Sequence, residues 1–252
     1  MLIAYDGTDY LGWQRLDRTP TVQQTLEDCL STIFNEKIDV IGSGRTDAGV
    51  HASAQQAHFD APPDERRIKQ LRVAMRRLLP PSVILKGLWL APPEFHAIWS
   101  VLKKTYKYRI NLGQCPSVFS YRFAGWYHYD LDIAKLRAYS EILLGYHDFK
   151  SFMNSGSPVK TTTREIYSAD WKEIRPGQLV FTITSNGFLK QMVRNIVGTQ
   201  VALNKKGAPP QAMKEILEAR DRQKALMTAP ARGLSLSRVY YPQNLDIQCR
   251  KI

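Results

Sequence analysis

One acidic side chain stands in a glycine-rich stretch of the sequence, and its surroundings suit covalent chemistry. Asp47 lies within Gly42 to Ala52, two residues after Arg45. Glycines remove side-chain bulk and allow positive φ, so a backbone or a flat ligand can approach closely. An aspartate that a nearby cation keeps ionised can attack an activated carbon and form an ester. A simpler interpretation stays open, because aspartate commonly closes a turn with its own side chain.

Two residues far away in the sequence are candidates for the same site. Arg194 lies in an apolar segment, where a guanidinium is costly to bury without a carboxylate partner. The alternative for Arg194 is simple exposure on the outer face of its helix. Tyr106 lies on a predicted strand and is either a platform for stacking a base or an ordinary core residue.

Several other chemistries lack their motifs. His51 and His58 lie on a predicted strand, and neither an HExxH motif nor a cysteine cluster accompanies them, so no metal site is expected. The chain has no Walker lysine motif and no G-x-S-x-G motif. The pair Gly42 and Gly44 lacks the third glycine and the following helix of a dinucleotide-binding loop.

The charge of the chain favours a polyanionic partner. Lys and Arg number 35 against 23 Asp and Glu, which gives a net charge of +12. Basic residues gather on a predicted helix at residues 66 to 77 and on a predicted strand at 103 to 109, where tyrosines alternate with them. Solvated faces are one interpretation of these runs, and contact with phosphates and bases is the other.

Cysteine usage and hydropathy indicate an intracellular protein. The three cysteines, Cys29, Cys115 and Cys249, are widely spaced and suit a reducing cytosol. No apolar run reaches the roughly 18 residues of a membrane span, and the first residues do not resemble a signal peptide. We therefore expect a soluble, cytoplasmic protein.

The elements that must position Asp47 follow from hydrophobic periodicity. In the first half, strands are predicted at 2–5, 38–41, 53–59 and 83–90, and helices after Thr21 and at 65–79. Thr21 caps the first helix, with Gln24 in the capping-box position and Val22, Leu26, Leu30 and Ile33 on one face. Ile68, Leu71, Met75 and Leu78 form the predicted buried stripe of the second. Strand, helix, two strands, helix, strand is the ferredoxin-like order of an α+β fold.

The second half loosely repeats the first. Strands are predicted at 105–112, 164–171, 179–184 and 234–241, and helices at 133–144, 188–203 and 210–219. Neither a long linker nor low-complexity sequence separates the halves. We expect an N-terminal half at 1–98 and a C-terminal half at 99–252 that share one continuous sheet.

The stretch Gly44 to Ala52 resembles the signature of the tRNA pseudouridine synthase A family, which isomerises uridines in the anticodon arm of tRNA. The resemblance extends over nearly the whole chain. Further segments match family motifs in the right order: Tyr5 to Thr8, Gly12 to Arg15, Gln55 to Phe59, Phe95 to Ala97, Lys104 to Tyr108, Asp148 to Phe152, Met192 to Gly198 and Ala229 to Leu234.

The resemblance implies a role for each candidate residue. Asp47 would be the catalytic nucleophile, and Arg45 would help to hold the target nucleotide flipped out of its stack. Tyr106 would stack on the uracil and take part in proton transfer at carbon 5. Leu189 would form a wall of the pocket, and Arg194 would pair with Asp47. Enzymes that modify bases generally extrude their target into such a pocket.

The resemblance also implies the wider properties of the protein. The reaction needs no metal and no cofactor, because cleavage, rotation of the uracil and rejoining are internal to the substrate. The targets would be uridines 38, 39 and 40 in the anticodon stem-loop of tRNA, bound by a homodimer, with no DNA or membrane partner. The fold would be two related ferredoxin-like halves forming one mixed, mostly antiparallel sheet flanked by helices, with a central basic cleft.

Three departures from the family pattern bear on substrate contacts. Met153 stands where many members carry arginine, and Lys190 stands where relatives often have an aromatic residue or histidine. Met1 lies only four residues before Tyr5, which makes the first strand short. A relative acting on another tRNA stem or another RNA, and a catalytically silent RNA-binding protein, are the alternative functions. The latter is disfavoured, because a pure binder needs no carboxylate such as Asp47 among phosphates.

Overall fold

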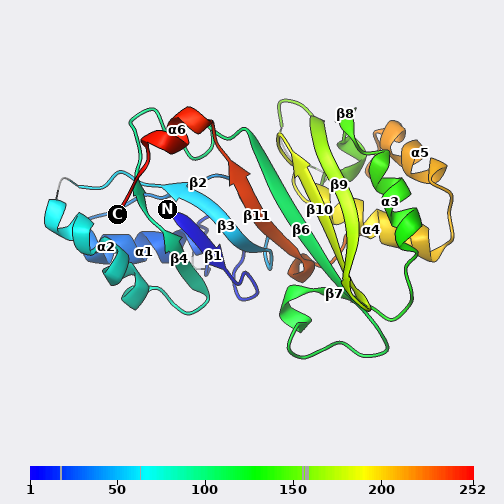
Figure 1. Cartoon of the computed structure of the whole chain (residues 1–252), viewed down its shortest axis with the longest axis horizontal. Coiled ribbons are helices and arrows are strands. Elements are labelled where there is room, and N and C mark those ends of the chain that lie inside the picture. Colours follow the sequence, from blue (N-terminus) through cyan, green and yellow to red (C-terminus); the bar gives the residue numbers. More distant parts are fainter. Residues whose placement is uncertain (18, 63, 155, 157–158) are drawn as a thin grey trace. The chain divides into compact units, whose positions relative to one another are not determined.

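The computed structural model describes residues 1–17, 19–62, 64–154, 156 and 159–252. The chain forms two compact units (Figure 1). Unit 1 comprises Met1–Leu102 and Leu236–Ile252, and unit 2 comprises Lys103–Ser235. The predicted division into 1–98 and 99–252 stays a prediction.

Unit 1 begins with the predicted order of strands and helices. Its elements are β1 (Leu2–Tyr5), α1 (Val22–Phe34), β2 (Ile41–Gly42), β3 (His51–His58), α2 (Glu65–Leu78), β4 (Val83–Gly87), β5 (Trp89–Leu90), α6 (Gln243–Gln248) and β12 (Arg250–Lys251). It also holds most of β11 (Leu234–Tyr240), which carries the chain back from unit 2.

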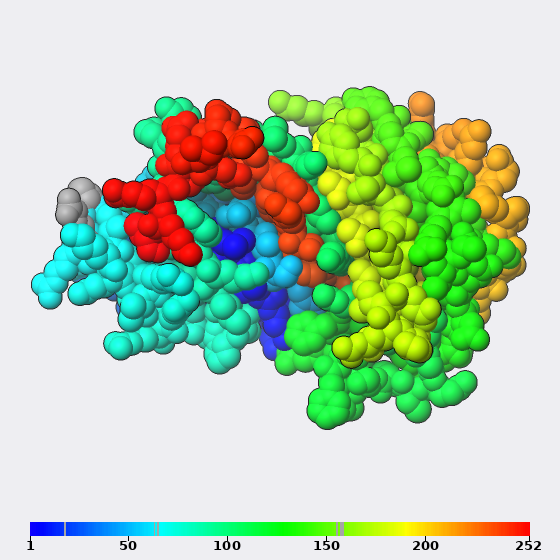
Figure 2. Space-filling view, viewed as in Figure 1, coloured from blue at the N-terminus to red at the C-terminus, as the bar shows by residue number. Residues whose placement is uncertain are grey.

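The sheet of unit 1 has the ferredoxin-like strand order. β1 lies between β4 and β3 and is antiparallel to both, while β2 pairs with β3 on the side away from β1. β11 is also a neighbour of β3. A separate pair joins β12 to β5, and Figure 2 shows the red C-terminal residues at the surface against blue and cyan residues of the same unit.

Helix α1 forms where the sequence predicts it, and the reason is local. The Thr21 side chain accepts a hydrogen bond from the Gln24 N–H at 3.4 Å, which satisfies one of the free N–H groups of the first turn. Val22, Leu26 and Leu30 are fully buried along one face of the helix. The cap and the apolar stripe therefore fix both the start of α1 and the face that packs on the core.

Two strand boundaries and one burial prediction in unit 1 were wrong. The strand predicted at 38–41 is only the two residues of β2, because side chains of α1 bind both backbone groups of Val40. The strand predicted at 83–90 divides into β4 and β5, which join different sheets. In α2, Leu71 and Met75 are buried as predicted, but Leu78 is 50% exposed in the last turn of the helix.

Unit 2 repeats part of the same pattern. Its elements are β6 (Lys103–Leu112), β7 (Gly125–Tyr127), α3 (Ile133–Glu141), β8 (Gly145–Asp148), β9 (Thr163–Arg175), β10 (Gln178–Ser185), α4 (Met192–Lys205) and α5 (Gln211–Ala219), with short 3-10 turns at Tyr121–Phe123, Lys150–Phe152 and Ala231–Gly233. The strand order is β6-β10-β9-β8, with β7 parallel to β6. The first, third and second main strands thus lie as in unit 1, which confirms an α+β protein with mostly antiparallel strands flanked by helices.

Helix α4 begins later than the sequence predicts. The periodicity places its start at Phe188, but the helix starts at Met192, after Gln191 in the left-handed conformation. The Ser185 hydroxyl donates to the Gly187 carbonyl at 2.7 Å and so stabilises a turn before the helix. From Met192 on, α4 is almost entirely buried, including the polar side chains of Asn195 and Gln200.

A glycine allows α4 to lie against an extended segment of unit 2. A Cβ on Gly198 would stand 2.0 Å from the carbonyl oxygen of Met227 and 2.8 Å from the backbone nitrogen of Ala229. Both are backbone atoms, so a side chain at Gly198 would push the helix and the segment apart.

We predict that Gly198→Ala lowers the free energy of unfolding by about 1 to 3 kcal/mol, because overpacking outweighs the better helix propensity of alanine. Gly187→Ala is the matched control, since its Cβ would be 3.4 Å from Arg164 Nε, an ordinary contact. Urea unfolding of both variants and the wild type measures the difference. Equal midpoints for Gly198→Ala and wild type would contradict the packing described here.

Candidate active site

The loop Ser43–Val50, between β2 and β3, carries two of the predicted site residues. Arg45 is exposed, Thr46 is buried and Asp47 is partly buried. The Val50 N–H donates to the Asp47 carbonyl at 3.1 Å, and Gly49 supplies the positive φ of 74° that closes the turn. Arg45 therefore faces solvent, whereas its neighbour Thr46 lies in the interior. We call this segment the Asp47 loop.

A second segment, the opening loop of residues 6–15, binds the Asp47 loop through backbone atoms. The Trp13 N–H donates to the Thr46 carbonyl at 3.1 Å, and the Gly49 N–H donates to the Tyr10 carbonyl at 3.2 Å. Gly12 has a φ of 99°, and a Cβ there would lie 2.5 Å from the Thr46 oxygen. Only glycine therefore allows the two loops to approach so closely.

Side chains from β1 and β3 form hydrogen bonds with the Asp47 loop. The hydroxyls of Tyr5 and Thr46 are 2.9 Å apart, and both residues are buried. Gln55 accepts from the Ser43 hydroxyl at 2.7 Å and donates to the Gly44 carbonyl at 2.8 Å. Burial raises the pKa of the Tyr5 hydroxyl well above its usual value, so this group stays neutral. The backbone is thus fixed on both sides of Arg45.

His51 has a structural contact in this loop system. Its Nδ1 lies 3.0 Å from the Gly7 N–H and 3.2 Å from an Asp6 carboxylate oxygen. The backbone N–H is always a donor, so Nδ1 accepts that hydrogen bond. Asp6 accepts from the N–H and hydroxyl of Thr8, at 3.0 and 2.6 Å. Within the described residues, no three His, Cys, Asp or Glu side chains form a group that could hold a metal ion.

Tyr106 and Leu189 belong to unit 2. Tyr106 lies on β6 opposite Ile183 of β10, is 8% exposed, and packs edge-on against the ring of Phe188 at 5.0 Å. Leu189, the next residue along the chain, is buried in the turn before α4. The structure therefore brings the Tyr106 ring close to the segment that contains Leu189. The ring is mostly buried, as in the simpler interpretation, so stacking on a base requires its small exposed part.

Arg194 is held by two backbone contacts in unit 2. Its Nε donates to the Ala229 carbonyl at 2.9 Å, and the Ala229 N–H donates to the Arg194 carbonyl at 3.0 Å. The residue is partly buried, so simple exposure on the outer face of α4 is not what the structure shows. The guanidinium has a defined orientation because its Nε is anchored.

The neighbour of Arg194 explains two of the sequence motifs that had no assigned role. Asn195 donates to the Phe152 carbonyl at 2.7 Å. Its side-chain oxygen accepts from the Thr228 hydroxyl at 2.6 Å and from the Arg222 guanidinium at 3.1 Å. The buried amide thus joins the segments around Phe152 and Thr228 to α4, and it fixes the helix turn that carries Arg194.

Two residues of β6 near Tyr106 lie on the predicted strand but were given no role in the site. Tyr108 is fully buried and donates to the Pro230 carbonyl at 2.9 Å; burial raises its pKa, with Tyr127 adding to this effect. Lys104 is partly buried, and burial lowers its pKa to about 8. Strand periodicity would have found both, since residues two apart share a face with Tyr106.

The basic helix α2 divides into structural and solvent-facing residues. Arg67 donates to the Phe34 carbonyl and pairs with Asp64 at 3.2 Å, so it stabilises the start of the helix. Four other basic side chains of the helix are exposed: Arg66, Lys69, Arg76 and Arg77. In the described part of the chain, no helix is both long enough and apolar enough to cross a membrane.

The five predicted site residues divide between the two units. Arg45 and Asp47 share the Asp47 loop of unit 1, whereas Tyr106, Leu189 and Arg194 belong to unit 2. The predicted pairing of Asp47 with Arg194 therefore stays a prediction.

Known proteins resemble this chain closely. The family model described as tRNA pseudouridine synthase matches residues 1–92 and 140–242. The tRNA pseudouridine synthase A of Bdellovibrio bacteriovorus is 49% identical, over 99% of this chain and 97% of that protein. The enzyme of the same name from Maridesulfovibrio salexigens is 40% identical, over 96% and 89%. That of Fervidobacterium nodosum is 36% identical, over 94% and 97%.

The matched regions contain the anchored parts of both units. The first includes the opening loop and the Asp47 loop, and the second includes Leu189, Arg194 and Ala229. Tyr106 lies between the two matched regions but within the nearly full-length matches to the relatives. The chain therefore belongs to the tRNA pseudouridine synthase family, whose members isomerise uridine to pseudouridine in tRNA.

Proposed function

We propose that this enzyme converts uridines 38, 39 and 40 of the tRNA anticodon stem-loop to pseudouridine, with Asp47 as the nucleophile. The observation that carries the proposal is the anchoring of the Asp47 loop. Its backbone is bound by the opening loop and by buried side chains of β1 and β3, while Asp47 itself is only partly buried. A carboxylate on so fixed a backbone meets the need for accurate placement against a reacting carbon.

The reaction is balanced without a further reagent. The bond between ribose C1′ and uracil N1 breaks, and a bond between C1′ and C5 forms. C5 loses its proton and N1 gains one, so substrate and product are isomers. The Asp47 carboxylate adds to the ribose or to the uracil and leaves again, which divides one difficult step into two easier ones. No metal and no cofactor takes part.

The other site residues bind and orient the flipped nucleotide. The exposed Arg45 guanidinium helps to hold the target nucleotide flipped out of its stack, and the fixed backbone on both sides of Arg45 limits how far this residue moves. Tyr106, which is 8% exposed, stacks on the uracil, and Leu189 forms a wall of the pocket. A base-modifying enzyme needs such a pocket because its target atom is inaccessible in a stacked base.

Arg194 pairs with Asp47 in this proposal and keeps the carboxylate ionised. The anchoring of its Nε on the Ala229 carbonyl supports this role, because the rest of the planar guanidinium then points in one direction. The charge of +12 and the exposed arginines of α2 support tRNA as the partner. A cytoplasmic homodimer, acting where tRNA is matured, completes the proposal.

Replacing Asp47 tests the chemistry directly. In Asp47→Asn the nucleophile is lost at constant size, so we expect no turnover while tRNA affinity stays within about tenfold, or ~1.4 kcal/mol. Release of tritium from tRNA labelled at uridine C5 measures the reaction. Asp28→Asn, at an exposed position of α1 in the same unit, is the control.

Transcripts with a single uridine at position 38, 39 or 40 test the proposed targets, and one with uridine only outside the anticodon arm tests the alternative. Tritium release by Asp47→Asn at the wild-type rate would overturn the mechanism. Release from the last transcript alone would overturn the target assignment but leave the mechanism standing.

Substitutions of Arg194 separate charge from geometry. Arg194→Lys keeps the charge but loses the two-point fork and the bond to Ala229, whereas Arg194→Ala removes the cation altogether. We expect single-turnover rates in the order wild type, Lys, Ala. A rate for Arg194→Ala equal to wild type would place Arg194 outside the site.

The salt dependence of binding tests the role of α2. Neutralising phosphates releases counterions, and each lost contact lowers the slope of log affinity against log salt by roughly 0.7 to 0.9. We expect the double variant Arg76→Ala with Arg77→Ala to lose about one to two units of slope. The control is Lys214→Ala on α5, where Lys214 already lies 3.8 Å from Glu218. An unchanged slope in the double variant would show that this face of α2 does not contact tRNA.

A further inference from the structure

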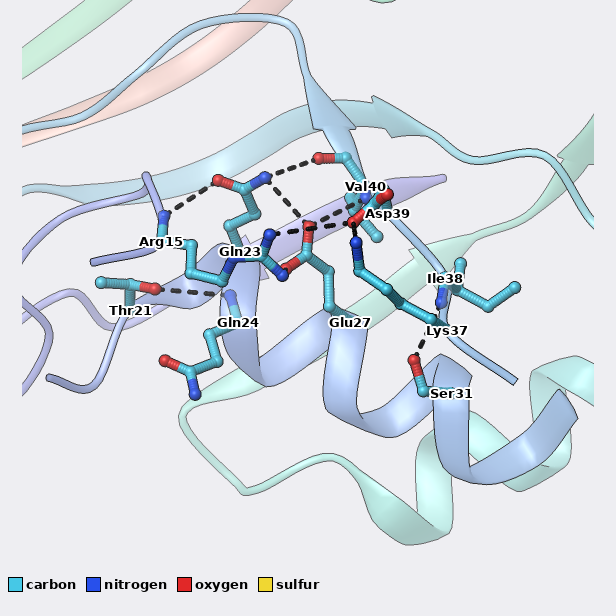
Figure 3. A network of polar contacts seen from close by, with 10 residues as sticks. All are labelled: Arg15, Thr21, Gln23, Gln24, Glu27, Ser31, Lys37, Ile38, Asp39 and Val40. Carbon is cyan, nitrogen blue, oxygen red and sulfur yellow. Dashed lines mark hydrogen bonds and ion pairs between the residues drawn. The ribbon is translucent and has the colours of Figure 1, made fainter. Parts of the chain in front are cut away.

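A buried carboxylate in α1 lies where two segments of unit 1 converge. Glu27 is 3% exposed and accepts three hydrogen bonds (Figure 3). The donors are Arg15 Nη1 at 2.9 Å, Gln23 Nε2 at 3.0 Å and the Val40 N–H at 3.0 Å. These three hydrogen bonds satisfy the buried carboxylate within the protein interior.

Two of the donors, Arg15 and Val40, belong to the two segments that lead to the Asp47 loop. Arg15 ends the opening loop, whose residues Gly12 and Trp13 touch the backbone of Thr46. Val40 lies just before β2, from which the chain enters the Asp47 loop at Ser43. Glu27 therefore receives one bond from each side of that loop.

Gln23 reinforces the same connection one helical turn earlier. Its side-chain oxygen accepts from the Arg15 N–H at 2.9 Å, and its Nε2 donates to the Val40 carbonyl at 3.0 Å. Its own N–H donates to the Trp13 carbonyl at 2.9 Å. The first two turns of α1 thus fix the spacing between the opening loop and the entry to the Asp47 loop.

Stability alone does not require an ion at this position. Replacing a buried ion pair by apolar residues of similar volume is often neutral or stabilising, whereas charged groups specify one arrangement of their donors. We propose that Glu27 is a positioning residue for catalysis: through Arg15 and Val40 it fixes the two segments that hold the Asp47 loop. This inference rests on the proposed role of Asp47.

The outer part of the network provides a matched control. Asp39 lies 3.8 Å from Arg15 and 3.3 Å from Lys37, but its side chain is 62% exposed. Exposed pairs of this kind contribute little. Asp39→Asn therefore removes a carboxylate next to the same arginine without touching the buried bonds.

Glu27→Gln breaks the network selectively. An amide in place of the carboxylate presents an NH₂ group to at least one of the donors, so Arg15 or Val40 loses its acceptor. Arg15→Ala is the second variant, because the Arg15 side chain is 46% exposed and its removal leaves Glu27 two donors. The thermal midpoint is measured for each variant. The single-turnover rate at saturating enzyme and the tRNA dissociation constant are then measured at a temperature well below that midpoint.

We expect both variants to lose roughly 10- to 100-fold in rate, as misplacement by about 1 Å does. The tRNA dissociation constant should stay within about threefold, and Asp39→Asn should match wild type. The double variant should be no slower than the slower single variant, because both changes break one connection. If Glu27→Gln does not fold, the single-turnover rate of Arg15→Ala alone tests the positioning role.

Two results would overturn the inference. One is a wild-type rate in folded Arg15→Ala; weaker tRNA binding at that unchanged rate would show instead that Arg15 contacts a phosphate. The other is an equal loss of rate in Asp39→Asn, which would show a general charge effect. Measuring Asp47→Asn in the same assay separates the two proposals. An active Asp47→Asn enzyme refutes the proposed function. If Asp47→Asn is inactive but Glu27→Gln and Arg15→Ala react at the wild-type rate, only the positioning role is refuted.

Discussion

The close contact between the opening loop and the Asp47 loop, which Gly12 permits, is the constraint on which the rest of unit 1 depends. Because Gly12 has no side chain, the opening loop comes close enough for Trp13 to bind the Thr46 carbonyl. The helix cap, the buried tyrosine under Thr46 and the network around Glu27 all act on segments that meet at this contact. Asp47 follows Thr46 directly, so the backbone contacts of Thr46 help to set its position.

Much of the architecture could be predicted from local patterns. The cap at Thr21 and the stripe of Val22, Leu26 and Leu30 defined α1, and alternation of tyrosines with basic residues defined β6. The ferredoxin-like order followed from the sequence of elements, and the strand order of unit 1 agrees with it. These features depend on residues close together in the chain, whose effect a sequence displays directly.

The incorrect boundaries have a common cause in contacts between distant residues. Val40 was predicted to lie in a strand, but the side chains of Gln23 and Glu27 bind its backbone groups. The residues next to Val40 in the sequence give no sign of these bonds. Leu88 continues an apolar run, yet the strand divides there because β5 pairs with a segment over 150 residues later. For the site, the resemblance named Arg45, Asp47, Tyr106, Leu189 and Arg194, while the supporting contacts of Glu27, Asn195 and Tyr108 appeared only in the structure.

The chain leaves unit 1 at Leu102 and returns to it only at Leu236, which has a consequence for synthesis on the ribosome. Unit 2 is continuous, so all of its strands have been made before the last residues of unit 1 emerge. Domains generally fold as units during synthesis. The strand β3, which begins directly after the Asp47 loop, waits for its neighbour β11 until more than nine tenths of the chain exists. The part of the protein made first is thus completed last, and a chain cut short before β11 lacks the strand that neighbours β3.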